Sequence, residues 1–225
     1  MLKTDLSVSA EIKLLYDLHI PDRLETPAPL IISVHGYGAH KNYMLREGKL
    51  IADQKFAVAS LQGPHQFYRE AKDGAMKVGF GWLTNYRSPE SVALHHKFVL
   101  DVIERLSAEG LIDDERIYLF GFSQSCALNF RFAFTYPDIL RGVIGVCGGI
   151  PSDLDTNEIY RPTEADVLYL YGDQDEFYPL EKFQTFEQRL KEYLPNFDCL
   201  RYRAEHEITG EMREDIKGWL EKAGD

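Results

Sequence analysis

One serine stands in a sequence context that could make it a nucleophile. Residues 117–120 are a short apolar run, and the Gly-Phe-Ser-Gln-Ser sequence at 121–125 leads directly into a helical apolar pattern. On a tight strand-to-helix turn, the hydroxyl of Ser123 would stand clear of the backbone, within reach of a histidine. Gly-x-Ser-x-Ser also occurs by chance, so the motif needs partners elsewhere in the chain.

Three further features could supply those partners. The His-Gly-Tyr-Gly sequence at 35–38 follows a β-branched run, and its glycines would let the N–H of Tyr37 face the site. A plain glycine turn is the alternative interpretation. Asp173 and Asp175 follow a later apolar run, and His206 follows the last one. A serine, an acid and a histidine are the groups that nucleophilic acyl transfer requires.

The elements that must position these groups alternate along the chain. Buried strands are predicted at 30–34, 56–61, 117–120, 143–147, 167–171 and 199–202, with an edge-side strand within 11–20. An amphipathic helix follows most of them. This alternation predicts an α/β protein whose mostly parallel central sheet is covered by helices on both faces. Functional groups of such sheets collect at the carboxyl ends of the strands, where all the candidates above are placed.

Helix ends and loops give more local predictions. Ser88 is predicted to cap a helix that has Pro89 at its first position, and Thr209 to cap the final helix. Residues 63–82 are predicted to form a long loop in which glycines and aromatic residues gather. This loop could line a substrate pocket or could pack on the surface as a lid.

Composition bounds the class of protein. A chain of 225 residues, 44% of them hydrophobic, is long enough for one sizeable core, so a single domain over 1–225 is predicted. The net charge of -11 argues against nucleic acid or an anionic membrane as the main partner. No apolar run approaches membrane-spanning length and the N-terminus has no signal-peptide core, so no stable membrane insertion and a cytoplasmic location are expected.

The cysteines and histidines do not form a recognisable metal or disulfide pattern. Cys126, Cys147 and Cys199 are an odd number and each lies in or beside an apolar segment, which favours buried free thiols in a reducing compartment. The side chains of His95 and His96 have no metal-ligand spacing with Cys, Asp or Glu. We therefore expect no metal site.

In these features the chain resembles the phospholipase/carboxylesterase family of α/β-hydrolases, which includes acyl-protein thioesterases and many small bacterial esterases. The segments that carry the resemblance are 35–38, 116–124, 149–151, 172–175 with Pro179, and 206–208, and the Gly-Phe-Ser-Gln string is the most specific. The resemblance implies an α/β-hydrolase fold with little or no cap. It also implies a serine hydrolase that acts on carboxylic esters or thioesters without a metal or organic cofactor.

The family pattern assigns roles to the candidate residues. Ser123 would attack the acyl carbonyl, and His206 would take its proton and later deliver it to the leaving group. The pattern places the orienting acid at the second Asp, which is Asp175. Asp173 is the competitor, because it lies nearer the strand end.

The resemblance also implies the oxyanion hole, whereas the pocket candidates include aromatic residues of the glycine-rich stretch 63–82. The backbone N–H groups of Tyr37 and Gln124 would form the oxyanion hole. Side chains expected to line the substrate pocket are His35, Phe80, Trp82, Ile150 and Phe177.

Three positions depart from the family pattern. Ser125 replaces a usual glycine and adds a hydroxymethyl group at a tight packing point, so a slightly altered turn is expected. Tyr37 is large and could narrow the acyl pocket. Glu205 replaces the usual glycine before His206, and Glu207 follows it. We hypothesise that these two carboxylates favour the charged imidazolium, which would move the acid limb of activity upward.

The leading prediction is a carboxylesterase for short to medium acyl chains, with a small-molecule substrate. A thioesterase acting on acylated protein or coenzyme A is the nearest alternative. A non-catalytic binder of a small ligand is the alternative from another class, and it ranks low because such proteins usually lose a member of the triad. A peptidase is also conceivable, but no large cap is present to restrict access. Either a monomer or a homodimer is compatible with the sequence.

Overall fold

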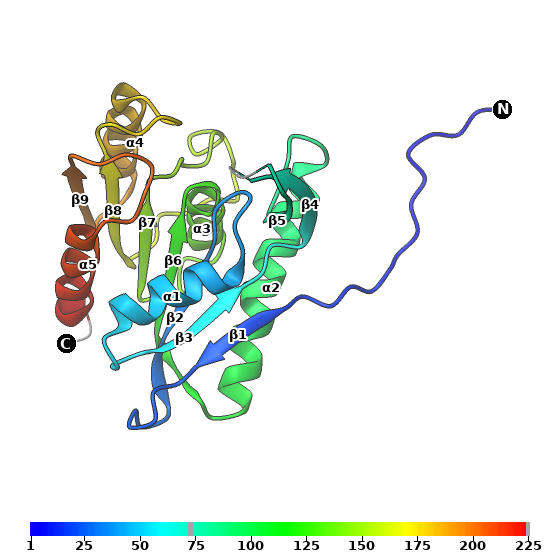
Figure 1. The fold of residues 1–225 in the computed structure, drawn as a ribbon. Coiled ribbons are helices and arrows are strands. Elements are labelled where there is room, and N and C mark those ends of the chain that lie inside the picture. Colours follow the sequence, from blue (N-terminus) through cyan, green and yellow to red (C-terminus); the bar gives the residue numbers. More distant parts are fainter. Residues whose placement is uncertain (72–73, 224–225) are drawn as a thin grey trace.

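A seven-stranded sheet forms the centre of the computed structural model, which describes residues 1–71 and 74–223 (Figure 1). Its strands are β1 (Tyr16–His19), β2 (Ala28–Val34), β3 (Ala57–Leu61), β6 (Ile112–Phe122), β7 (Gly142–Val146), β8 (Asp166–Gly172) and β9 (Phe197–Tyr202). The order across the sheet is β1-β3-β2-β6-β7-β8-β9. Only the edge pair of β1 with β3 is antiparallel among these described strands, so the predicted mostly parallel sheet is confirmed.

Helices cover both faces of this sheet, as predicted. They are α1 (Lys41–Ala52), α2 (Ser88–Ala108), α3 (Gln124–Thr135), α4 (Leu180–Tyr193) and α5 (Gly210–Ala223). The apolar residues of α1 and α5 belong to one core cluster, and those of α2, α3 and α4 belong to a second cluster on the other face (Figure 1).

The central strands show why the sequence contains continuous apolar runs. In β2, Leu30 and Ile32 join the core that packs on α2, α3 and α4, whereas Ile31 joins the core beneath α1 and α5. Successive side chains of a strand point to opposite faces, and both faces are covered here. Alternation is therefore absent, and a strand of this kind is recognised by its β-branched residues and short length.

Residues 63–82 differ from the predicted loop. They contain a two-stranded antiparallel hairpin, β4 (His65–Glu70) and β5 (Met76–Gly81), that is separate from the central sheet (Figure 1). Most of its residues are exposed. In β4 the apolar residues Phe67 and Tyr68 are adjacent rather than alternating, and in β5 the glycines at 79 and 81 are residues more typical of loops than of strands. Its contacts with the site are described below.

The two predicted helix caps have different outcomes. The N-cap of α2 is Arg87, at φ 51°, and Ser88 is already helical, so the predicted cap was one residue too late. The guanidinium of Arg87 binds the Glu90 carboxylate in the first turn, which supports this start without a hydroxyl cap. At α5 the prediction is confirmed, because the N–H of Met212 donates to the Thr209 hydroxyl at 3.2 Å.

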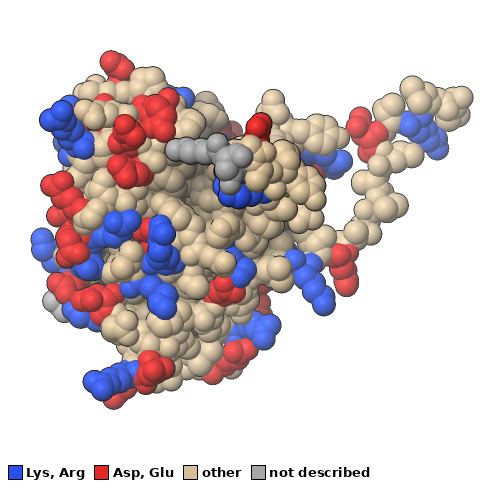
Figure 2. All heavy atoms as spheres, in the orientation of Figure 1, with Lys and Arg blue, Asp and Glu red and all other residues tan. Residues whose placement is uncertain are grey.

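The edges and surface of the molecule complete the fold. The predicted strand within 11–20 is confined to β1. Leu14 packs on the core and the Leu15 carbonyl accepts from the Gln62 N–H, whereas the first residues of the chain extend away from the sheet (Figure 1). On the face drawn in Figure 2, Asp and Glu are spread widely, with Lys and Arg among them. Within residues 1–71 and 74–223, no helix is long and apolar enough to cross a bilayer.

Candidate active site

Ser123 occupies a strained turn between β6 and α3, as its sequence context predicts. Its φ is 60° and its ψ is -119°, a conformation that L-residues rarely adopt. Close approach of three chain segments makes the turn tight. A Cβ atom on Gly36 would lie 3.0 Å from the Ser123 Cβ, and one on Gly148 would lie 2.3 Å from the Ser123 carbonyl oxygen. At these two positions it is the space beside Ser123 that requires a glycine.

Ser125 strengthens this turn. Its side chain is fully buried, and its hydroxyl donates to the Val34 carbonyl at 2.7 Å and accepts from the Phe122 N–H at 2.9 Å. The hydroxymethyl group therefore connects the end of β2 to the end of β6, where a glycine could not. A hydroxyl that satisfies two buried backbone groups contributes on the order of 1 kcal/mol for each hydrogen bond.

A hydrogen-bonded chain of three side chains crosses the carboxyl ends of the strands. The Nε2 atom of His206 lies 2.8 Å from the Ser123 Oγ, and its Nδ1 lies 2.7 Å from Asp175 Oδ2. The Asp175 side chain is buried, and its Oδ1 accepts from the N–H groups of Phe177 at 2.8 Å and Tyr178 at 2.9 Å. Donors on both oxygens hold this carboxylate in one orientation, with Oδ2 facing the imidazole.

The competing acid lies elsewhere. Asp173 Oδ2 accepts from the Arg201 guanidinium, from Nη2 at 2.8 Å and from Nε at 3.1 Å. Arg201 belongs to β9, so this pair connects the loop after β8 to the neighbouring strand. The two aspartates thus have different partners, and Asp175 is the one that contacts His206.

The His206 imidazole packs among aromatic rings. The rings of Phe122 and Phe177 lie 4.9 Å and 4.8 Å from it, centroid to centroid. Its backbone N–H donates to Glu176 Oε2 at 3.1 Å, and hydrogen bonds from the backbone of Glu176 itself and of His206 lower the pKa of this carboxyl. The aromatic rings therefore hold the imidazole of His206, and Glu176 holds its backbone.

Glu205 and Glu207 are exposed on either side of His206, and the N–H of Glu207 donates to the Glu205 carbonyl. Their hypothesised effect on the pH profile of activity stays a prediction.

The 36–39 loop also approaches Ser123, through Gly36. Within the part of the chain that the structure describes, the backbone N–H groups of Tyr37 and Gln124 have no hydrogen-bond acceptor. The Gln124 side chain, in contrast, is hydrogen-bonded through both its oxygen and its nitrogen. Its Oε1 accepts from the Trp82 N–H and its Nε2 donates to the Leu83 carbonyl, each at 3.0 Å. This pair of bonds connects the end of the hairpin to the turn that carries the serine.

Two residues expected in the pocket wall are instead buried beneath the site. His35 and Trp82 are 0% and 1% exposed. The Nδ1 of His35 donates to the Gly36 carbonyl at 2.7 Å and its Nε2 accepts from the Gly63 N–H at 2.9 Å, while the Trp82 indole donates to the His35 carbonyl. Burial lowers the pKa of His35 to about 4, which keeps the ring neutral and suits its accepting nitrogen. These two side chains offer no surface to a substrate.

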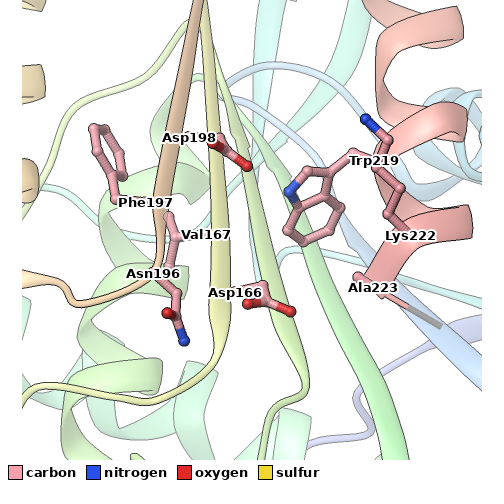
Figure 3. A pocket seen from close by; sticks show the side chains of 8 residues that line it. All are labelled: Asp166, Val167, Asn196, Phe197, Asp198, Trp219, Lys222 and Ala223. Carbon is pink, nitrogen blue, oxygen red and sulfur yellow. The ribbon is translucent and has the colours of Figure 1, made fainter. Parts of the chain in front are cut away.

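The other expected pocket residues differ in exposure. Ile150 is buried, Phe80 is half-buried, and Phe177 is 67% exposed beside His206. A cavity of about 340 Å³ lies far from them, between the starts of β8 and β9 and the end of α5, where Asp166 and Trp219 line it (Figure 3). Asp166 begins β8, whereas Asp175 follows the end of that strand. This cavity therefore lies at the amino ends of the strands, and Ser123 lies at their carboxyl ends.

Sequence comparisons place the chain among known proteins. A sequence model of the Phospholipase/Carboxylesterase family matches residues 18–223. The chain belongs to this family. Among known relatives of the chain, the protein named "Putative esterase NocK" from Nocardia uniformis is 30% identical over 164 residues, 70% of this chain and 43% of that protein. Acyl-protein thioesterase 1 from Gibberella zeae is 26% identical over 106 residues, 45% of each chain.

Solved structures share the fold. A carboxylesterase from Bacillus cereus superposes with a TM-score of 0.71 at 18% identity, covering 93% of this chain and 94% of its own. The esterase PE8 superposes with a TM-score of 0.72 at 17% identity, covering 94% of this chain and 100% of its own. The predicted α/β-hydrolase fold and family are therefore confirmed. The chain spans less than half the length of the curated relatives it matches.

Within the described residues, no group of three or more His, Cys, Asp or Glu side chains is arranged to hold a metal ion. The three cysteines are free thiols, two of them buried and Cys199 half-buried.

Proposed function

We propose that this protein is a serine hydrolase that cleaves carboxylic esters through an acyl-enzyme intermediate. The observation that carries the proposal is the continuous chain from Ser123 Oγ through His206 to the buried Asp175, at 2.8 Å and 2.7 Å. A neutral imidazole between a hydroxyl and a carboxylate accepts a proton from the first and is stabilised as a cation by the second. The family membership supports the same reaction class.

The reaction would proceed in two halves. In the first, Ser123 Oγ bonds to the acyl carbon as its proton passes to His206 Nε2, and the tetrahedral intermediate then collapses as Nε2 returns the proton to the departing alkoxide. In the second, a water takes the place of the alcohol, with the same proton transfers, and releases the carboxylic acid. Asp175 keeps its charge throughout and holds the imidazole in the tautomer with hydrogen on Nδ1.

The carbonyl oxygen would be stabilised by two backbone donors. The N–H groups of Tyr37 and Gln124 have no other acceptor among the described residues. Gln124 directly follows Ser123, and Tyr37 follows Gly36, which packs against the serine. Preorganised donors aimed at a developing oxyanion are worth about 3 kcal/mol each, because they require no reorganisation during the reaction.

The substrate proposal is a small-molecule ester with a short to medium acyl chain. A thioesterase activity on acyl-protein or acyl-coenzyme A is the second candidate, favoured by the similarity to a protein named acyl-protein thioesterase 1. The same serine chemistry serves both, because an alkoxide and a thiolate leave from analogous tetrahedral intermediates and give the same acyl-enzyme. A monomeric or homodimeric state and a cytoplasmic location stay predictions.

The test is hydrolysis of p-nitrophenyl esters from acetate to palmitate, and of an acyl-thiocholine, by the wild type and by Ser123→Ala. We expect turnover that disappears in the variant, and labelling of Ser123 by a fluorophosphonate. If neither ester nor thioester is hydrolysed and the fluorophosphonate does not label the folded protein, the site is not a serine hydrolase site. Faster thioester than ester turnover would establish the second candidate.

A further inference from the structure

We propose that the β4–β5 hairpin positions the Tyr37 N–H for the oxyanion, with Phe67 and Gly79 as its positioning residues. This inference rests on the proposed function, because it concerns a donor that acts only if the site forms an oxyanion. It assigns a role in catalysis to a segment that lies outside the central sheet and supplies none of the triad side chains.

The backbone of the hairpin pairs with the 36–39 loop. The N–H of Gly38 donates to the Phe80 carbonyl at 2.8 Å, and the N–H of Phe80 donates to the Ala39 carbonyl at 3.2 Å. The 36–39 loop therefore pairs with the C-terminal part of β5, at Phe80. Gly38 has a φ of 76°, and glycine has little conformational preference of its own. External contacts must then decide the direction in which the loop's N–H groups point.

One face of the hairpin meets this loop. Phe67 and Gly79 are cross-strand partners, so their substituents lie on the same face. The Phe67 ring stacks on Tyr37, with centroids 4.7 Å apart and 21° between the planes. A Cβ atom on Gly79 would lie 2.9 Å from the Gly38 carbonyl oxygen and 3.1 Å from its Cα. The absence of a side chain at Gly79 therefore sets how closely the hairpin seats on the loop.

The backbone is consequently held on both sides of Tyr37. On its N-terminal side, Gly36 packs against the Ser123 turn with no room for a side chain. On its C-terminal side, Gly38 is bonded to the hairpin. The hairpin is in turn tied to the turn that carries the serine, because Gln124 accepts from the Trp82 N–H just after β5. The two proposed oxyanion donors, at Tyr37 and Gln124, are thus linked through the hairpin, which fixes the spacing between them.

The opposite face of the hairpin supplies matched controls. Tyr68 and Val78 are also cross-strand partners, one position along each strand, and their side chains are 74% and 45% exposed. Because alternate residues of a strand point to opposite faces, they face away from the 36–39 loop. Truncating Tyr68 removes an aromatic cross-strand contact from the same hairpin and leaves the contacts to Tyr37 and Gly38 in place.

The experiment compares Phe67→Ala, Gly79→Ala and Tyr68→Ala with the wild type on one p-nitrophenyl ester. We expect kcat to fall by about tenfold or more in the first two variants while KM stays within about twofold, since only the transition state uses the oxyanion donors. The Kd of an alkyl boronic acid, which forms a tetrahedral adduct on the serine, should rise by the same factor. Phe67→Tyr keeps the stacked ring and should restore kcat, and Tyr68→Ala should leave kcat and Kd unchanged.

Two results would overturn the inference while the proposed function stands. In the first, the Phe67 and Gly79 variants keep the kcat and the boronic acid affinity of the wild type. In the second, Tyr68→Ala loses as much activity as Phe67→Ala, which would mean that the hairpin contributes only stability; thermal unfolding of each variant accompanies the kinetics. Both proposals fail if the wild type shows no turnover that depends on Ser123.

Discussion

The two sides of Ser123 are built in different ways. On one side, His206 and Asp175 are held by side-chain hydrogen bonds of 2.7 Å and 2.8 Å and by loops that follow the strands β8 and β9. On the other side, the Tyr37 N–H is held by backbone pairing and an aromatic stack from a hairpin outside the sheet. The first side depends on residue identity, and the second depends on how closely backbones approach. Substitutions should therefore affect the two sides differently.

The largest effect is expected at the acid. Asp175→Asn keeps the size of the side chain but presents an amide to His206 Nδ1, which favours the wrong tautomer, so kcat/KM should fall by about 10⁴-fold. Asp173→Asn is the matched control, since Asp173 pairs with Arg201 and not with the histidine. It should stay within about threefold of the wild type, as expected for loss of an exposed ion pair. Ester hydrolysis by both variants measures this, and equal losses would contradict the assignment of Asp175.

A single added methyl group in the 36–39 loop should lower kcat. In Gly36→Ala, the new Cβ would lie 3.0 Å from Ser123 Cβ and 3.2 Å from the Phe122 carbonyl oxygen. Either the loop or the serine must shift by a few tenths of an ångström. Because a displacement near 1 Å costs about 10²-fold, kcat should fall by roughly threefold to tenfold. Gly218→Ala in α5 is the control, because a Cβ there meets no atom within 4 Å. That change should leave kcat unaltered and raise the free energy of unfolding by roughly 0.5–1 kcal/mol. Wild-type kcat in Gly36→Ala would show that the approach to Ser123 is not constrained.

The Ser125 hydroxyl connects the two sides, and its loss should affect stability more than chemistry. Ser125→Ala leaves the Phe122 N–H and the Val34 carbonyl without their partner. An unsatisfied buried backbone group costs about 1–3 kcal/mol, so the free energy of unfolding should fall by about that amount. Urea unfolding measures the change. A variant as stable as the wild type would mean that the neighbouring backbone finds other partners.

The smallest expected effect is on acid stability, and it belongs to the side of the 36–39 loop. Burial lowers the pKa of His35 to about 4 and that of His95, beneath Trp82, to about 3. Below pH 6.5 the unfolded chain binds protons that these folded imidazoles do not, so the free energy of unfolding decreases as pH falls from 6.5 toward 4. Each histidine contributes roughly 1.4 kcal/mol per pH unit. His35→Gln should reduce the slope by about that amount, measured by urea unfolding between pH 7 and 5. An unchanged slope would contradict a buried neutral His35.

The part of the site that the sequence predicts is the part made of distinctive residue types. Ser123, Asp175 and His206 each follow an apolar run, and side chains with these chemistries are rare at such positions. His35 and Trp82 show the limit of this reasoning. Both are aromatic, close in sequence to glycines and near the site, yet they pack beneath it, because local sequence does not indicate which side of a loop faces solvent.

The sequence by itself therefore determined the α/β architecture, the family and the candidates Ser123, Asp175 and His206, because strand and helix periodicities and ordered motifs are local properties of the chain. Only the tertiary structure decided that residues 65–70 and 76–81 pair as a hairpin and that this hairpin packs on Tyr37 and Gly38. The glycines of β5 and the adjacent aromatic residues of β4 obscure the strand pattern, and the contacts of the hairpin with the 36–39 loop join backbone atoms and rings about 30 to 40 residues apart along the chain. Such contacts depend on the spatial approach of segments, which no short stretch of sequence encodes.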